Sequence, residues 1–148
     1  MSTFTHSELV KIAAKWAEPK HRIIITERGA IHELPDVLAI GYGFSTLIEV
    51  KISRSDFLRD KRKLTRRDGD FCAGNYRIYC VPKGLITEND IPDDWGLLEV
   101  YPSGKARLKV NIYKYSRPNT IWWHEDSVEG LKAEKHILMN HFLYPKIS

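Results

Sequence analysis

The chain of 148 residues has 43% hydrophobic and 28% charged residues, the composition of one soluble globular domain, which excludes collagen-like, coiled-coil and disordered proteins. No apolar run approaches the roughly 18 residues of a membrane span, and the first ten residues lack the pattern of a secretory leader. Two cysteines, Cys72 and Cys80, are too few for a disulfide framework and form no zinc motif, so we expect reduced cysteines, a cytoplasmic location and no membrane partner. The net charge of +4 is a weak indication of a polyanionic partner.

An N-terminal helix is predicted over residues 5–17. Its apolar side chains recur at the spacing of one helical stripe: Leu9, Ile12, Ala13 and Trp16. Thr5 followed by Glu8 is the pattern of a capping box, which predicts the start of the helix. Glu18 precedes Pro19 and is therefore biased away from helical geometry, which predicts the end.

Three short strands are predicted next: 21–28, 34–40 and 46–52. Gly29 is predicted to turn the chain after the first of them. The second and third are joined through GYGFS, whose glycines suit a tight hairpin.

A polar helix over residues 53–67, capped by Ser53 or Ser55, carries the densest charge of the chain. Its segment 59–67 holds six basic residues against Asp60, an excess larger than the net charge of the whole chain. Such a run is often only a solvated helix face, but its position directly after a charged strand favours phosphate binding. The basic residues predicted to bind nucleic acid are Arg54, Arg59, Lys61, Arg62, Lys63, Arg66 and Arg67.

The remaining elements complete an α+β domain. A strand over residues 75–82, a loop with at most a helical turn over 87–95, a hairpin of strands 96–102 and 105–113 across Ser103 and Gly104, and a closing helix over 127–143 are predicted. No repeat or linker interrupts the chain, so we expect a single domain over residues 1–148, with 113–148 as a C-terminal extension packed on it.

Three charged residues, Asp36, Glu49 and Lys51, lie in the otherwise apolar hairpin. Because side chains alternate along a strand, Glu49 and Lys51 share one face. A loop over residues 41–44 sets Asp36 directly opposite Glu49, with Cβ atoms roughly 5 Å apart. Two carboxylates so close repel unless a positive charge lies between them, and oxygen ligands suit Mg²⁺, with Mn²⁺ as a substitute. The competing interpretation is a structural ion pair between Lys51 and one of these carboxylates.

These residues resemble the signature of the PD-(D/E)XK nuclease superfamily: Pro35-Asp36, then Glu49-Val50-Lys51 after a hairpin. The segments IEVKISRSDFLRDKRK, YRIYCVP and GLLEVYPSGK are most similar to its MmcB-like DNA repair branch and phage relatives. The resemblance implies a restriction-endonuclease-like core of helix, three strands, helix and strand, with a mixed central sheet flanked by helices. It also implies Asp36 and Glu49 as metal ligands, Lys51 as the catalytic lysine, and a Mg²⁺-dependent nuclease acting on DNA in repair, recombination or phage DNA processing.

Further acidic residues could complete such a site. Many members of the superfamily add an acid from the first helix, which here could only be Glu8, although the capping box competes for it. Relatives in the repair branch often carry a Gly-Arg-Arg-like stretch before the aspartate, where this chain has HELPD. Glu27, His32 and Glu33 are therefore additional candidates, with a surface position the simpler interpretation for both glutamates.

Other chemistry is weakly indicated. The six histidines show no metal-ligand spacing, and Trp122-Trp123 fit a packed core better than base stacking. The alternative function is a catalytically inactive nucleic-acid-binding module on the same fold. RNA in place of DNA, endo- or exonuclease action, and a homodimer stay open.

Overall fold

A six-stranded mixed sheet in the strand order β1-β2-β3-β4-β5-β6 forms the centre of the molecule. The computed structural model describes residues 4–27, 35–66, 73–114 and 128–144. The elements follow the predicted order: α1 (His6–Ala17), η1 (Glu18–Lys20), β1 (Ile23–Thr26), β2 (Val37–Ile40), β3 (Ser45–Val50), α2 (Arg54–Arg66), β4 (Tyr76–Pro82), β5 (Gly96–Val100), β6 (Ala106–Val110), η3 (Ile112–Lys114) and α3 (Val128–Leu143). The loop 87–95 forms turns and contains no helix.

The predicted starts of the first two helices are confirmed. Thr5 is the N-cap of α1: its side chain accepts from Glu8 N at 3.1 Å, and Glu8 Oε1 accepts from Thr5 N at 3.1 Å. The box satisfies two of the backbone donors that a helix start leaves unpaired. At α2, Ser53 Oγ accepts from Asp56 N at 3.2 Å, so Ser53 is the capping serine.

The β2–β3 hairpin has the predicted register, with Ile40 paired to Ser45 and Val37 to Ile48. The loop is closed by Gly41 N, which donates to Phe44 O at 2.8 Å. A side chain at Gly41 would be crowded, because a Cβ atom there would lie 3.1 Å from both Lys20 O and the Phe44 ring. Continued by one residue, this register sets Asp36 opposite Glu49.

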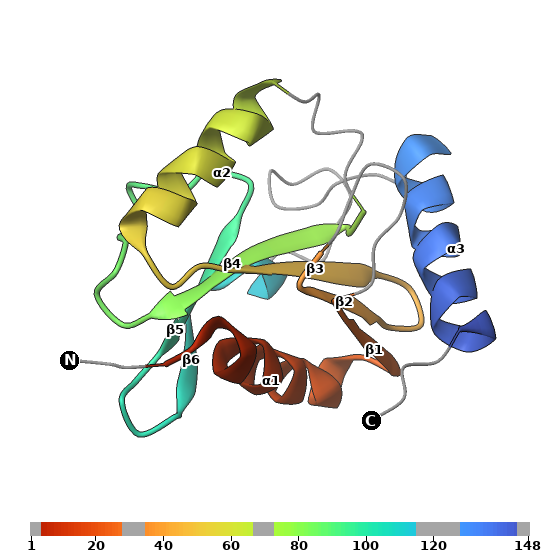
Figure 1. Ribbon diagram of the computed structural model, residues 1–148, viewed down its shortest axis with the longest axis horizontal. Coiled ribbons are helices and arrows are strands. Elements are labelled where there is room, and N and C mark those ends of the chain that lie inside the picture. Colours follow the sequence, from red (N-terminus) through yellow and green to blue (C-terminus); the bar gives the residue numbers. More distant parts are fainter. Residues whose placement is uncertain (1–3, 28–34, 67–72, 115–127, 145–148) are drawn as a thin grey trace.

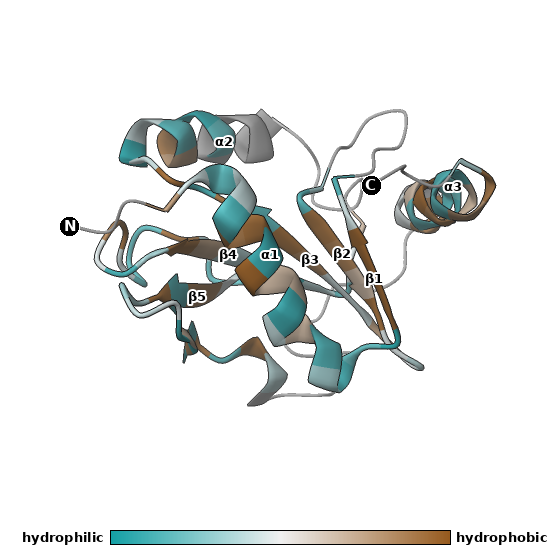
Figure 2. Ribbon diagram, turned by 60° about the horizontal axis from the view of Figure 1, so that its bottom comes forward, coloured by the Kyte–Doolittle hydropathy of each residue, from teal (hydrophilic) through white to brown (hydrophobic). Residues whose placement is uncertain are grey.

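Helices cover both faces of the sheet (Figure 1). One core cluster joins α1 to one face, with Leu9, Ala13, Ile48, Val50 and Leu98 among its members. The other cluster joins α2 and α3 to the opposite face through Phe57 and Ile137, together with Leu47, Tyr79 and Leu97. Figure 2 shows the strands largely hydrophobic and α2 largely hydrophilic, as expected for a helix with one buried side. The chain is therefore an α+β protein with helices on both faces of a mixed sheet.

The directions of the strands bring the ends of several strands to one edge of the sheet. β3, β4 and β5 are mutually parallel, whereas β2 is antiparallel to β3 and β6 is antiparallel to β5. The C-terminal ends of the three parallel strands therefore meet the beginnings of β2 and β6. α2 begins at this edge because it follows β3, and α1 begins there too, since His6 reaches Asp36. We call this the C-terminal edge.

A buried polar chain lies at the other end of α1. His21 Nδ1 is 2.7 Å from Ala17 O, which can only accept, so Nδ1 carries the hydrogen. His21 Nε2 then accepts from the Thr46 hydroxyl at 2.8 Å, and the Tyr113 hydroxyl donates to Thr46 Oγ1 at 2.7 Å. Burial is the main reason that the pKa of His21 is lowered.

Two further expectations concern cysteine and the membrane. Cys80 is buried and free, and burial raises the pKa of its thiol to about 12, so it is held as an inert thiol. Cys72 lies outside the described residues. Among the described helices, none is both long and apolar enough to cross a membrane.

Candidate active site

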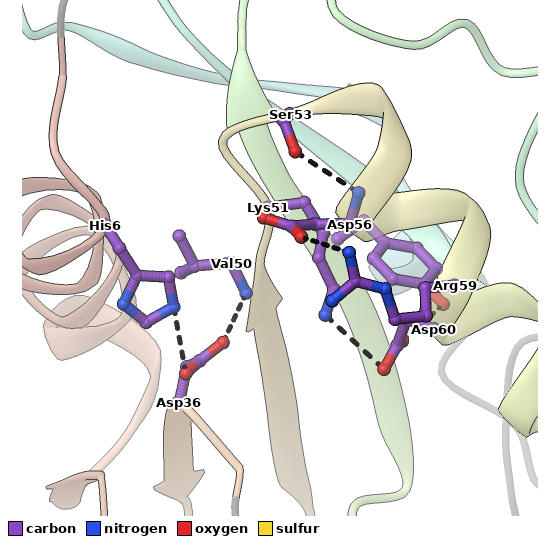
Figure 3. Close-up of polar contacts among 9 residues, drawn as sticks. His6, Asp36, Val50, Lys51, Ser53, Asp56, Arg59 and Asp60 are labelled. Atoms are coloured by element: carbon purple, nitrogen blue, oxygen red, sulfur yellow. Dashed lines mark hydrogen bonds and ion pairs between the residues drawn. The ribbon is translucent and has the colours of Figure 1, made fainter.

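Asp36 lies where α1, β2 and β3 meet at the C-terminal edge. Its Oδ2 accepts from Val50 N at 2.8 Å, and its Oδ1 lies 3.2 Å from His6 Nε2 (Figure 3). The Asp36 side chain is only 16% exposed. The carboxylate is thus held in place from two sides before any ligand binds.

Glu49 lies near the end of β3, and Lys51 directly follows the last residue of this strand. Along β3, Ile48 and Val50 belong to the core under α1, whereas Leu47 belongs to the core under α2. Side-chain alternation therefore places Glu49 on the face opposite Ile48 and Val50, as predicted, and the structure shows that α2 covers this face. Lys51 Nζ lies 3.4 Å from Asp60 Oδ1 and is 15% exposed. The structural ion pair of Lys51 is thus formed with Asp60 on α2.

Asp60 is itself fixed by a buried aromatic residue. The Tyr79 hydroxyl donates to Asp60 Oδ2 at 3.2 Å, so the two carboxylate oxygens of Asp60 serve Tyr79 and Lys51 separately. The Tyr79 ring is fully buried and stacks on Trp95 at 4.4 Å between centroids. A rigid part of the core therefore positions the ammonium of Lys51.

One polar cavity of about 300 Å³ contains the three residues predicted to be catalytic: Asp36, Glu49 and Lys51. His6, Asp56, Arg59 and Asp60 also line it. The cavity is therefore rich in carboxylates, with one lysine, one arginine and one histidine to balance them. Such an arrangement suits a cation and a phosphate together better than an apolar ligand.

The chemical type of the ligand atoms in this cavity suits Mg²⁺, because Asp36 and Glu49 offer carboxylate oxygens. In the described parts of the chain, no group of three or more His, Cys, Asp or Glu side chains is arranged to hold a metal ion. A Mg²⁺ ion held by two carboxylates would keep several waters and take phosphate oxygens from a substrate, which is its usual behaviour in proteins.

Glu8, the further metal ligand considered from the sequence, has its carboxylate in the capping box and is exposed. It does not line the cavity, and His6 from the same helix does. Spacing could not reveal His6, because its partner Asp36 is 30 positions away. The only available signal was its place in the first turn of a helix expected to pack beside the hairpin.

The other acidic candidates lie near Asp36 in the chain. Glu27 is exposed and has φ of +52°, an uncommon conformation for a residue other than glycine. Its backbone N–H donates to Asp36 O at 2.9 Å, so Glu27 supports the backbone of Asp36. His32 and Glu33 lie outside the described residues.

Two of the predicted phosphate-binding residues are already paired. Arg54 makes two hydrogen bonds to Asp90, at 3.2 and 3.3 Å, and this contact is the main reason that the pKa of Asp90 is lowered to about 2. Arg59 Nη2 lies 3.5 Å from Asp56 Oδ1. The remaining predicted side chains lie outside the described part: Lys61, Arg62, Lys63, Arg66 and Arg67, as do Trp122 and Trp123.

Comparison with known proteins gives information on the fold and none on the chemistry of the site. No family model and no curated protein matches the chain. A solved structure of a protein of unknown function from Silicibacter pomeroyi is similar, with a TM-score of 0.65 over 98% of this chain and 95% of that one. The two share 17% sequence identity, so the likeness concerns the fold alone.

Proposed function

We propose that this protein is a metal-dependent nuclease that hydrolyses phosphodiester bonds in DNA. The supporting observation is that Asp36, Glu49 and Lys51 line one cavity at the C-terminal edge, beside the helix that carries the basic run. The order helix, three strands, helix, strand agrees with a restriction-endonuclease-like core, which we include in the proposal.

Asp36 and Glu49 would hold the Mg²⁺ ion, which when bound polarises the phosphodiester and increases the acidity of water. Lys51 orients the attacking water and stabilises the negative charge that develops on the phosphate. Asp60 is a positioning residue, because it holds the Lys51 ammonium at 3.4 Å. His6 and Val50 N–H position the Asp36 carboxylate in the same way.

A panel of labelled DNA substrates tests the proposal: linear duplex, nicked, branched and single-stranded, each with Mg²⁺, Mn²⁺ or EDTA. Cleavage that requires the metal, and that is lost in Asp36→Asn, is the expected result. A matched RNA panel decides the class of nucleic acid.

Binding without cleavage of any member of the panel would overturn the nuclease proposal and leave the inactive nucleic-acid-binding module. Cleavage that persists unchanged in EDTA, or in Asp36→Asn, would exclude this cavity as the active site.

A further inference from the structure

A second group of cations lies around the β5–β6 hairpin, apart from the basic run of α2. It comprises Lys83, Lys105 and Arg107 with Tyr101, and we call it the hairpin surface. All three cations are exposed. Lys83 Nζ lies 4.5 Å from the centre of the Tyr101 ring, a cation–π contact. Tyr101, Lys105 and Arg107 also line a hollow of about 490 Å³.

The hairpin surface carries charge that no ion pair among the described residues neutralises. Within the described residues, Lys105 and Arg107 have no carboxylate within ion-pair distance. By contrast, the lysine and the arginine that line the candidate active site, Lys51 and Arg59, each pair with an aspartate. Unpaired exposed cations attract counterions, and a polyanion that replaces those counterions gains their release.

The one acid of the hairpin, Glu99, is buried and bonded within the protein. Glu99 is 5% exposed, and its Oε2 accepts from Gly84 N at 3.1 Å. Its Oε1 lies 3.9 Å from Lys109 Nζ. Both carboxylate oxygens of Glu99 are thus engaged by the protein, and neither forms an ion pair with Lys105 or Arg107.

The strand register relates the hairpin surface to the candidate active site. Arg107 pairs with Glu99, and Glu99 pairs with Val81. Continued by one residue, the β3–β4 register pairs Lys51 with Val81. Lys51 and Arg107 thus lie on one row of the sheet, three strands apart, a separation of about 14 Å at roughly 4.8 Å per strand. Figure 1 shows the β5–β6 hairpin and the start of α2 on the same side of the molecule.

We infer that the hairpin surface binds the phosphate backbone of the DNA, about four base pairs from the bond held at the candidate active site. A separation of about 14 Å corresponds to that number at 3.4 Å per base pair. The inference rests on the proposed DNA substrate. It deepens that proposal, because it requires a substrate that extends past the cavity in the direction of β6.

Binding is measured without cleavage, by anisotropy of a fluorescein-labelled 20-base-pair duplex in EDTA over a series of salt concentrations. The double variant Lys105→Ala/Arg107→Ala should weaken binding by about tenfold per lost contact near 0.05 M salt. The slope of log K against log salt should fall by about 0.9 per contact. Lys83→Ala is a second variant with the same expected direction.

The matched control is Lys15→Ala/Lys135→Ala, which removes two exposed charges from α1 and α3. It should leave the salt slope within error of the wild type. Thermal midpoints of all variants confirm that they are folded.

Failure of this inference and failure of the proposed function give different results. Wild-type affinity and salt slope in both hairpin variants would overturn the inference and leave the nuclease proposal standing. Binding that depends on the hairpin, in a protein that cleaves nothing with Mg²⁺, would overturn only the nuclease proposal. A wild-type protein that binds no DNA overturns both.

Substrate length locates the contact where cleavage is observed. Duplexes are shortened in single steps on either side of the cut. When fewer than about four base pairs remain on one side of the cut, the wild type should no longer cleave the duplex faster than Lys105→Ala/Arg107→Ala. A difference in cleavage rate that is the same at every duplex length would place the contact elsewhere.

Discussion

Asp60 Oδ1 lies 3.4 Å from Nζ of Lys51, and Asp60 Oδ2 accepts from the Tyr79 hydroxyl. Asp60→Asn keeps a similar shape but removes the charge that holds the ammonium. We expect kcat to fall, by as much as 10²-fold if the ammonium moves by about 1 Å, with KM and Mn²⁺ affinity nearly unchanged. Tyr79→Phe is the control, since it keeps the carboxylate beside Lys51 and should lose less. Equal kcat in Asp60→Asn and the wild type would show that the contact is structural only.

Substitutions of Lys51 and Asp36 should impair different steps, cleavage in one case and metal binding in the other. Lys51→Ala keeps both carboxylates, so we expect a folded protein that binds Mn²⁺ and DNA but cleaves about 10²–10⁴ times more slowly. Asp36→Ala removes a ligand and should lose cation binding together with cleavage. Cleavage rate, Mn²⁺ affinity by calorimetry and thermal midpoint decide the matter. Full specific activity in folded Lys51→Ala would rule out the proposed role of the lysine.

The basic run of α2 should supply sequence-independent affinity. Reversing Lys61, Arg62 and Lys63 to glutamate should weaken binding of unrelated duplexes to a similar extent and flatten the salt dependence. The measurement is the salt slope for two sequences of different composition. An unchanged slope would identify the run as a solvated helix face.

Glu8 distinguishes a helix cap from a metal ligand. Glu8→Ala should lower the free energy of unfolding by about 1 kcal/mol, because Thr5 N loses its partner. Glu8→Gln keeps an acceptor that suits a capping box and should restore most of that stability. We expect Mn²⁺ affinity to be the same in all three proteins. A drop in Mn²⁺ affinity in Glu8→Gln, with stability retained, would instead make Glu8 a metal ligand.

His21 should give the fold a pH dependence on the acid side. Burial lowers the pKa of His21 below 6.5, so the unfolded chain takes up a proton more readily than the folded one. Stability is therefore complete above the unfolded value and declines as the pH falls below about 6.5 toward the folded pKa. Thermal midpoints from pH 8 to pH 5 should show this decline, and His21→Gln should reduce it. An identical decline in the variant would assign it to other groups.

Local patterns were sufficient for much of the fold. The capping box of α1 and the start of α2 were confirmed, as was the hairpin register from Val37 to Ile40, which continued by one residue sets Asp36 opposite Glu49. Each depends on residues near one another in the chain, where periodicity and turn chemistry act directly. Whether the cavity performs the predicted chemistry stays a prediction.

Contacts between distant elements could not be predicted in the same way. Asp60 meets Lys51 only because α2 packs Phe57 against the sheet beside Tyr79. Arg54 was predicted to bind phosphate, yet it pairs with Asp90, 36 positions later, once the β4–β5 connection folds beside α2. His6 reaches Asp36 for the same kind of reason. Such pairings depend on how whole elements dock, which no short pattern encodes.

The order of the strands in the sheet is also their order along the chain, and this has a consequence for folding. The β2–β3 hairpin closes through a four-residue loop, whereas β3 and β4 are joined only after 25 intervening residues. Loop closure costs entropy that grows with length, so the hairpin should form first and the parallel pairs later. During synthesis, Asp36, Glu49 and Lys51 would then be brought together on a nascent chain before β5 and β6 have left the ribosome.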